Sequence, residues 1–327
     1  MKNRHVALIT WVSCGILFMA GEACLASTVA SDGKETTIHI SDHVVEITGR
    51  LGIGLVTGES HELVYETSTA RKVSELTWQL ENVSMLNVGV TITPTQWLKL
   101  NADLWVKLND GDGHMDDYDW RMPGWDWTDW SHSEDTSLTE GYIFDINGEV
   151  PFYTHAQTAF NAIVGFKRDS WEWEARGGSF VYSSFFLHDT VGSFEPGSLG
   201  ITYKQWYNVP YVGVGFDSRL TNVSFSGRLI ASPFAYANDE DTHHMRHLFF
   251  EEDFDPTFMW SLNLGGRYHF NPQLALTAMF HYQHYDEAKG NMTITDLFSG
   301  ERVTISGDAA GIDHTSHMFS LALQYTF

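Results

Sequence analysis

Apolar and polar residues alternate with a period of two along most of the chain, which is typical of β-strands whose two faces meet different surroundings. Between residues 98 and 108 every even position is apolar, whereas the odd positions include Lys99, Asp103 and Lys107. The strands of a soluble sandwich also alternate, but they average about five or six residues. The runs in this chain are longer, so the pattern favours a transmembrane barrel whose polar interior is filled by ion pairs.

The number and spacing of the alternating runs predict how the barrel closes. Outer-membrane barrels have an even number of antiparallel strands, with short turns in the periplasm and long loops outside. Short and long connections alternate here in the same way. We therefore predict an all-β fold, a ten-stranded antiparallel transmembrane β-barrel. Its strands are expected at 43–58, 71–93, 97–108, 138–150, 158–182, 199–206, 211–230, 261–269, 274–286 and 312–327. Its short turns are expected at 94–96, 151–157, 207–210 and 271–273, and its long loops at 59–70, 109–137, 183–198, 231–260 and 287–311.

One predicted strand is unusually long. Apolar residues stay on even positions from Leu76 to Ile92, across the polar residues Asn82 and Ser84, so residues 71–93 are read as a single strand. At about 3.3 Å per residue such a strand runs to roughly 75 Å, whereas the apolar layer of a membrane is about 25–30 Å thick. The barrel is therefore expected to project well beyond the outer membrane.

The first 26 residues have the character of a secretory leader. Lys2 and Arg4 precede an apolar run at 6–20, which is too short to span a membrane comfortably, and small residues lead to Ala26. We expect residues 1–26 to be a signal peptide and residues 27–327 to form a single outer-membrane barrel domain.

Both ends of the chain agree with export to the outer membrane. Cys14 and Cys24 lie in the leader, so the mature chain is expected to have neither a disulfide nor a thiol nucleophile. The chain ends in alternating apolar residues that close on Phe327, which is typical of the last strand of a bacterial outer-membrane protein. We therefore expect the outer membrane of a Gram-negative bacterium as the location.

Composition narrows the possible partners. The 12 Trp, 13 Tyr and 21 Phe suit the aromatic girdles of a barrel at the two membrane surfaces. The net charge is −23, and it is one unit more negative without the leader. Such a surface repels nucleic acid and attracts cationic substrates. No part of the sequence indicates an oligomer, so a monomer is expected.

Two groups of acidic residues lie in predicted long loops, at 110–119 and 238–246. The loops share the outer rim and lie almost opposite each other in a ring of ten strands. Crowded carboxylates raise one another's pKa, and an imidazolium lowers them, so such a group can hold a proton near neutral pH and activate water. The alternative is that these loops only solvate the barrel or bind divalent cations between lipid headgroups.

Metal and nucleophile motifs are weak in these loops. Residues 110–119 lack the turn glycine of a calcium loop, and the three histidines at 243, 244 and 247 lack the glutamate of a zinc protease helix. Ser131 and His132 are adjacent in an extended segment, where neighbouring side chains rarely face each other. We therefore expect no metal, no cofactor and no serine nucleophile.

Six segments resemble the omptin family of outer-membrane proteases along nearly the whole mature length. They are "ARKVSELTW" at 70–78, "MDDYDW" at 115–120, "EARGGSFVYSS" at 174–184, "ITYKQ" at 201–205, "DEDTHHMR" at 239–246 and "LQYTF" at the end. The resemblance implies a ten-stranded barrel and an endopeptidase that cleaves after Arg or Lys, often between two basic residues. Cationic peptides and host proteins are the substrates that it implies.

The resemblance also assigns roles to individual residues. The catalytic aspartate pair falls on Asp117 and Asp119, and the Asp-His dyad on Asp241 and His243. A water between His243 and Asp117 is the expected nucleophile, without an acyl-enzyme. The pocket for the basic side chain is expected to contain Glu62 and Asp239, with Ser74 and Met115 in its wall.

The chain departs from the family pattern at four positions. Thr242 and Glu240 replace residues that are commonly Glu and Asn, which leaves the catalytic positions intact. Ser170 and Trp206 stand where the family has arginines that bind lipopolysaccharide, and Lys167 and Arg168 are candidates to replace them. Lipopolysaccharide is thus a candidate activator whose binding must differ from the family's.

A second class of function remains open at this point. An outer-membrane adhesin or a narrow porin with acidic surface loops would share the barrel pattern and the charge. A porin would leave an Arg-Arg peptide intact, an adhesin could bind it without cutting, and a protease would cleave it.

Overall fold

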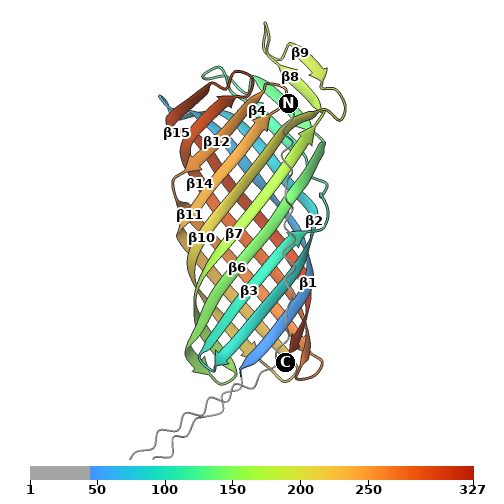
Figure 1. The fold of residues 1–327 in the computed structure, drawn as a ribbon, viewed down its shortest axis with the longest axis vertical. Helices are drawn as coiled ribbons and strands as arrows, with labels where there is room; N and C mark the ends of the chain where they lie inside the picture. Colours follow the sequence, from blue (N-terminus) through green and yellow to red (C-terminus); the bar gives the residue numbers. More distant parts are fainter. Residues whose placement is uncertain (1–44) are drawn as a thin grey trace, which may run out of the picture. The chain divides into compact units, whose positions relative to one another are not determined.

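The computed structural model describes residues 45–327, which form one closed antiparallel sheet (Figure 1). Closure occurs because β1 pairs with both β2 and β15. The strands are β1 Glu46–Glu66, β2 Arg71–Thr95, β3 Leu98–Lys107, β4 Met115–Asp119, β5 Asp129–Ser133, β6 Asp135–His155, β7 Thr158–Arg176, β8 Ser179–Tyr182, β9 Thr190–Ser193, β10 Leu199–Arg219, β11 Val223–His243, β12 Leu248–Phe254, β13 Thr257–His269, β14 Leu274–Asp296 and β15 Arg302–Thr326. Within the described range no helix is long and apolar enough to cross a membrane.

The fifteen strands form ten staves, a stave being one line of strand between the two rims. Five staves are built from two strands each: β3 with β4, β5 with β6, β7 with β8, β9 with β10, and β12 with β13. For example, β12 and β13 both lie between β11 and β14. The predicted all-β, ten-stranded antiparallel barrel is confirmed in this sense. The predicted leader and the start of the mature chain lie outside the described residues.

One predicted turn, at 207–210, is wrong. β10 runs through these residues to Arg219, and the chain turns at 220–222 instead. Proline has no N–H to give to a sheet, so within a sheet it is confined to edges, strand starts and bulges. Here the ladder between β10 and β11 is interrupted between Asn208 and Val212, so the missing donor falls at a bulge. The predicted strands 199–206 and 211–230 are therefore β10 and the first half of β11.

Most of the predicted long loops are also strand. β1, β11, β14 and β15 continue through 59–66, 231–243, 287–296 and 302–311, and β12 begins at Leu248. These upper segments mix small, apolar and polar side chains, so their apolar alternation is weak although most of their backbone remains paired. Consequently the acidic groups expected in loops lie on paired strands. The upper wall of the barrel is a rigid support for them.

The long strand β2 is confirmed, but its two halves face in opposite senses. Leu76 and Trp78 are buried inside, whereas below Asn82 the even position Val88 is 53% exposed and Met85 is fully buried. Asn82 has a φ of 54°, and the pairing with β1 shifts register between Val56 and Gly58. Such a bulge inserts one extra residue and reverses the side-chain alternation. The even-numbered apolar residues therefore contact the interior above Asn82 and lipid below it.

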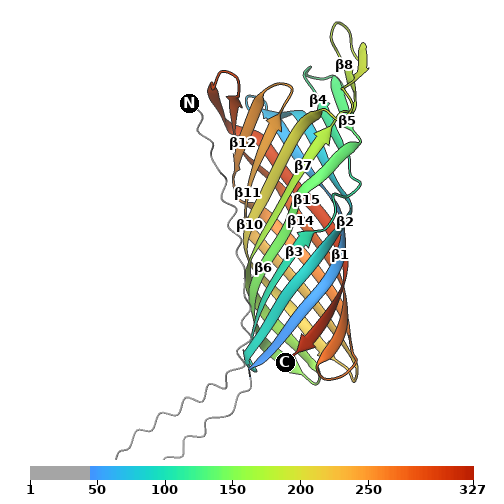
Figure 2. The same ribbon diagram turned by 45° about the vertical axis from the view of Figure 1, so that its right-hand side comes forward.

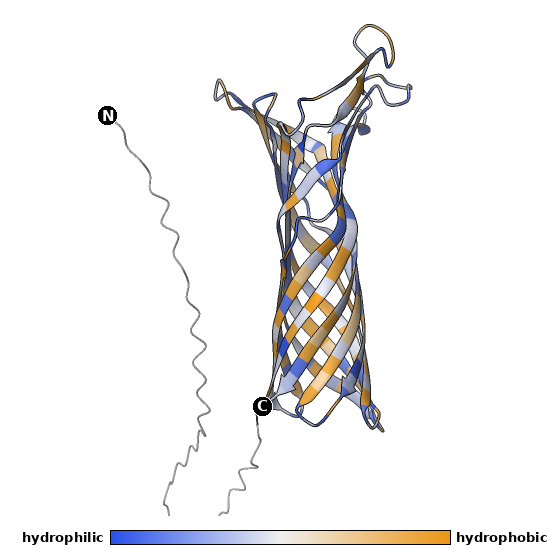
Figure 3. Ribbon diagram, turned by 90° about the vertical axis from the view of Figure 1, so that its right-hand side faces the viewer, coloured by the Kyte–Doolittle hydropathy of each residue, from blue (hydrophilic) through white to orange (hydrophobic). Residues whose placement is uncertain are grey.

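The lower half of the barrel carries the apolar outer surface (Figure 3). Leu51, Ile53 and Leu55 point outward on β1, and they are followed higher up by Glu59 and His61. Because the outward positions become polar there, the apolar layer of the membrane ends near Leu55. The part of the barrel above this level is in water.

Ion pairs fill the interior of the lower half. Arg50 lies 2.7 Å from Asp103, Lys99 lies 2.7 Å from Asp217, and Arg228 lies 2.6 Å from Glu149. Lys107 bonds to Asp110 and to the Leu138 carbonyl. The predicted filling of the interior is confirmed, and a cavity of about 320 Å³ remains among these groups.

Candidate active site in the upper barrel

The expected catalytic residues lie on β4 and β11, in the part of the barrel above the apolar band (Figure 2). Side chains alternate along a strand, so residues two apart share a face. Asp117 and Asp119 therefore share one face of β4, and Asp239, Asp241 and His243 share one face of β11. In the closed sheet both faces point into the barrel.

Both aspartates of β4 have raised pKa values. Burial and the charge of Asp119 raise the pKa of Asp117 to about 7, although His243 acts in the opposite direction. Burial also raises the pKa of Asp119, against a hydrogen bond from Ser74. The Ser74 hydroxyl lies 3.5 Å from Asp117 Oδ1 and thus between the two carboxyl groups. The pair can hold one proton near neutral pH.

His243 and Asp241 form a close dyad. Nε2 of His243 lies 2.6 Å from Oδ2 of Asp241, whose side chain is only 1% exposed. Nδ1 of His243 is 3.3 Å from the guanidinium of Arg246. A guanidinium only donates hydrogen bonds, so in the neutral imidazole Nδ1 accepts and Nε2 carries the proton that faces Asp241. The free lone pair of His243 is therefore on Nδ1.

The charges of the dyad and of the aspartate pair shift each other's pKa values. Burial lowers the pKa of His243, but the charge and hydrogen bond of Asp241 outweigh it, and Asp117 contributes in the same direction. In turn His243 lowers the pKa of Asp117. Each group is thus within the field of the other across the interior of the barrel, as the sequence predicted.

A second acidic group lies directly below the dyad. Glu62 on β1 and Asp239 on β11 are 5% and 2% exposed, and Glu252 on β12 is 3% exposed. Tyr203 donates a 3.0 Å hydrogen bond to Asp239 Oδ2. No cation neutralises the three carboxyl groups among the described residues. Burial raises the pKa of Asp239 to about 7 and holds the pKa of Glu62 and Glu252 well above the usual range.

Aromatic rings pack next to this acidic cluster. Trp78 stacks on Tyr203 at 5.2 Å between ring centroids, and Trp173 lies 6.0 Å from Trp78. Met115 pairs with Trp78 across β4 and β2 and is 2% exposed. Met115 therefore lies beside Trp78, and Ser74 lies beside Asp117. Aromatic faces next to carboxyl groups are suited to a long basic side chain.

The raised pKa values predict how stability depends on pH. Asp239 has an ordinary pKa of 3.8 when unfolded and about 7 when folded, so the folded state binds this proton more tightly. Its stabilising contribution is complete below about pH 3.8 and is lost as the pH rises to about 7. The thermal midpoint of the unliganded barrel in detergent should therefore fall between pH 5 and pH 8 because of this group. In Glu252→Gln the fall should be smaller and the midpoint at pH 8 higher.

The control for this prediction is Glu251→Gln, which alters the neighbouring outward-facing acid on the same strand. Its pH profile should match that of the parent protein. Equal pH profiles for Glu251→Gln and Glu252→Gln would contradict the conclusion that the buried acids cause the fall of the thermal midpoint with pH.

Two residues near the site were not predicted from the sequence. Glu252 was hidden in a predicted loop, although β11 and β12 pair so that it lies directly opposite Asp239. A hairpin prediction around the turn at 244–247 would have revealed it. Arg246 lies within the segment "DEDTHHMR", but the resemblance assigns it no role. In the structure its charge lowers the pKa of Asp117 and Asp119.

Two other pairs of neighbouring residues lie on opposite faces of the sheet. Ser131 is buried, whereas the adjacent His132 lies on the outer face of the sheet with Asp116. They do not form a nucleophile and base. Lys167 is buried in the interior, 3.2 Å from Asp169. The expectation that Lys167 replaces a lipid-binding arginine on the outer surface is therefore wrong. Arg168 remains a candidate, since it bonds to Tyr142 and Asn208 outside.

Comparisons with known proteins agree with this architecture. The family model "Omptin family" matches residues 43–327. The plasminogen activator of Yersinia pestis is 32% identical over 275 residues, which cover 84% of this chain and 87% of the relative. Outer membrane protease OmpP of Escherichia coli (strain K12) is 27% identical over 93% of this chain and 97% of its own length.

A solved structure gives the same result. The outer membrane protease OmpT from Escherichia coli superposes with a TM-score of 0.81 at 25% identity, over 86% of this chain and 97% of that chain. With a family model that covers most of its length and a relative above 30% identity, this chain belongs to the omptin family of the outer membrane.

Proposed function

We propose that this outer-membrane protease is an endopeptidase that cleaves peptide bonds after Arg or Lys with a water molecule as the nucleophile. One observation carries the proposal. A buried Asp-His dyad lies near a buried aspartate pair, and a cluster of three buried acids without a cationic partner among the described residues lies beside them. The first arrangement suits activation of water, and the second suits recognition of a basic side chain.

In the proposed mechanism His243 Nδ1 removes a proton from water, and the resulting hydroxide attacks the peptide carbonyl. Asp241 holds Nε2–H, fixes the orientation of the ring and stabilises the imidazolium that forms. The proton shared by Asp117 and Asp119 is available to the oxyanion of the tetrahedral intermediate. The imidazolium then gives its proton to the leaving amine, and no covalent enzyme intermediate forms.

Arg246 occupies the position in front of the base when no substrate is bound. Its guanidinium contacts Nδ1, so the water and the substrate must displace it before His243 can accept a proton. A cationic substrate brings its own positive charge to this acidic site, which offsets the loss of Arg246. This exchange favours basic over neutral substrates in addition to the pocket.

The pocket supplies the specificity in this proposal. A guanidinium or ammonium group that enters it meets Glu62, Asp239 and Glu252, which release their excess protons as the cation binds. Charge-assisted hydrogen bonds to carboxylates are strong, and an apolar side chain would leave these acids without partners. We propose lipopolysaccharide as a candidate activator that binds outside near Arg168, and a monomer as the working form.

A peptide digest tests the proposed function. The refolded full-length mature protein is given quenched peptides that contain Arg-Arg, Arg-Ala or Ala-Ala, with and without lipopolysaccharide, in water enriched in oxygen-18. We expect cleavage after arginine, one heavy oxygen in the new carboxylate and no initial burst of amine product. An intact Arg-Arg peptide in both conditions would support the adhesin or porin instead, and cleavage after Ala would contradict the role of the pocket.

A further inference from the structure

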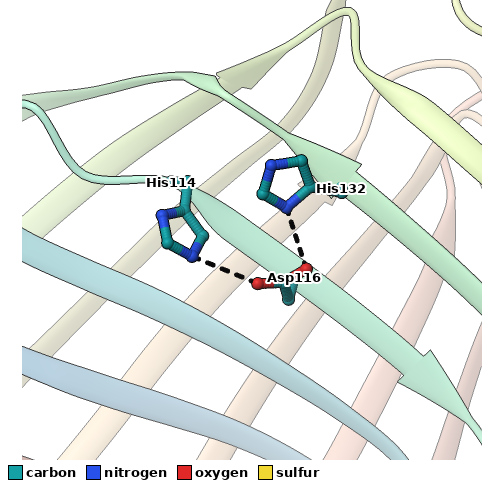
Figure 4. A group of neighbouring side chains, drawn as sticks. All are labelled: His114, Asp116 and His132. Atoms are coloured by element: carbon teal, nitrogen blue, oxygen red, sulfur yellow. Dashed lines mark hydrogen bonds and ion pairs between the residues drawn. The ribbon is translucent and has the colours of Figure 1, made fainter.

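Two histidines and an aspartate meet on the outer face of the β4–β5 hairpin (Figure 4). Nε2 of His114 lies 3.2 Å from one carboxylate oxygen of Asp116, and Nδ1 of His132 lies 2.9 Å from the other. All three donor atoms lie within 4.8 Å of one another. Asp116 points away from the interior, so this cluster is separate from Asp117 and from the mechanism proposed above.

The spacing of the donors matches a small tetrahedral ion. Zinc bonds to imidazole nitrogen and to carboxylate oxygen are about 2.0–2.2 Å long, so adjacent donors of a tetrahedral ion lie about 3.3 Å apart. The separations of 3.2 Å and 2.9 Å, each to a different oxygen of Asp116, are close to this value, and one donor atom from each residue lies within 4.8 Å of the others. Small side-chain movements would bring one donor from each residue onto a single ion. Two imidazoles with one carboxylate favour zinc and its neighbours over calcium or magnesium, which prefer oxygen.

The surroundings hold these groups in the orientation that a metal site requires. Metal-bound histidines usually give their other ring N–H to a carboxylate. The second nitrogen of His132, Nε2, lies 3.0 Å from Glu134 Oε1. The indole N–H of Trp130 donates to Asp116 Oδ1 at 2.9 Å and so fixes the carboxylate. These contacts are independent of the donor spacing and point to the same use.

We propose that His114, Asp116 and His132 form a binding site for a divalent transition metal of the zinc class, with Glu134 orienting His132. The side chains of the three ligands are 20–31% exposed, so the ion can enter from solvent and keep water in its fourth position. A bound ion joins β4 to β5 directly behind Asp117, since Asp116 and Asp117 are consecutive residues of β4. The ion thereby fixes the strand that carries the aspartate pair.

Cobalt and zinc titrations test the site on the refolded full-length mature protein in detergent. We expect one equivalent of Co²⁺ to give the intense visible absorption of tetrahedral cobalt, and one equivalent of Zn²⁺ to remove it. His132→Ala should abolish the signal. Glu134→Gln should weaken binding about 10- to 100-fold, the usual effect of removing a partner of a ligating histidine. Glu134 has an 86% exposed side chain, so its replacement leaves folding intact.

Two further variants separate this site from other histidines. His155→Ala, on the opposite rim, is the matched control and should bind like the parent protein. His243→Ala removes the catalytic imidazole and should still bind one equivalent. Loss of the signal in His243→Ala, or unchanged binding in His132→Ala or Glu134→Gln, would overturn the proposal. None of these outcomes depends on proteolytic activity, so they do not test the proposed function.

Discussion

Replacement of His243 by alanine is expected to lower kcat/KM for an Arg-Arg peptide by about 10²- to 10⁴-fold, the range for loss of a general base. Asp117→Asn should have a similar effect, because it removes the carboxyl group whose pKa is affected by both Asp119 and His243. The measurement is the initial rate of peptide cleavage by each refolded variant. Both variants should keep the heat-dependent gel migration of a folded barrel, since neither residue belongs to the hydrophobic clusters.

The pH profile separates a base from a merely structural histidine. The imidazole accepts a proton only when it is neutral, so the rate should fall as the pH drops through the raised pKa of His243. Asp241→Asn removes the charge and the hydrogen bond that raise this pKa, so the acid limb should move to lower pH while the maximal rate falls. An acid limb that stays in place in Asp241→Asn would refute the assignment of His243 as the base.

Replacement of Asp239 by asparagine should remove most of the preference for basic substrates. Truncating one partner of a buried charge pair costs about 2–5 kcal/mol, which corresponds to roughly 30- to 5,000-fold in kcat/KM for the Arg peptide. Rates for peptides with a neutral residue at this position should change little. The comparison therefore uses the ratio of Arg to Ala cleavage rather than the rate alone.

Glu240→Gln is the matched control for this prediction. Glu240 follows Asp239 on β11, is exposed and points outward, so it alters the net charge equally without entering the pocket. Its Arg to Ala ratio should equal that of the parent protein. An equal loss in both variants would show that general electrostatic attraction, and not the buried acids, selects the substrate.

The fold could be predicted from the sequence where one face of a strand contacts lipid. In that region each even or odd position has a fixed environment, so the alternation of residues such as Leu100 and Asn101 reveals strand, face and span. The upper barrel has water on the outside and acids inside. Alternation is weaker in segments such as 231–243, whose inward positions include the small residues Ala235 and Ala237 and the acids Asp239 and Asp241. The sequence therefore predicts a loop there, although most of this segment is paired.

The candidate site, too, could be predicted only in part from the sequence. The roles of Asp117, Asp119, Asp241 and His243 follow from resemblance to a family, and the structure brings the two pairs within each other's electrostatic field across the interior. Glu252 could not be found in this way, because its role depends on the register of β12 against β11. That register follows from the hairpin turn at 244–247 and is not revealed by hydrophobic alternation.

Asn82, whose φ is positive, limits which insertions and deletions β2 can tolerate. It divides β2 into a lower segment whose even positions meet lipid and an upper segment whose even positions line the reaction chamber. Deleting this single residue would turn Trp78, Leu76 and Ser74 inside out relative to the membrane anchor. Between the lipid-facing segment and the upper segment, insertions and deletions are thus tolerated only in steps of two residues. Such steps keep the inward-facing residues of both segments facing inward.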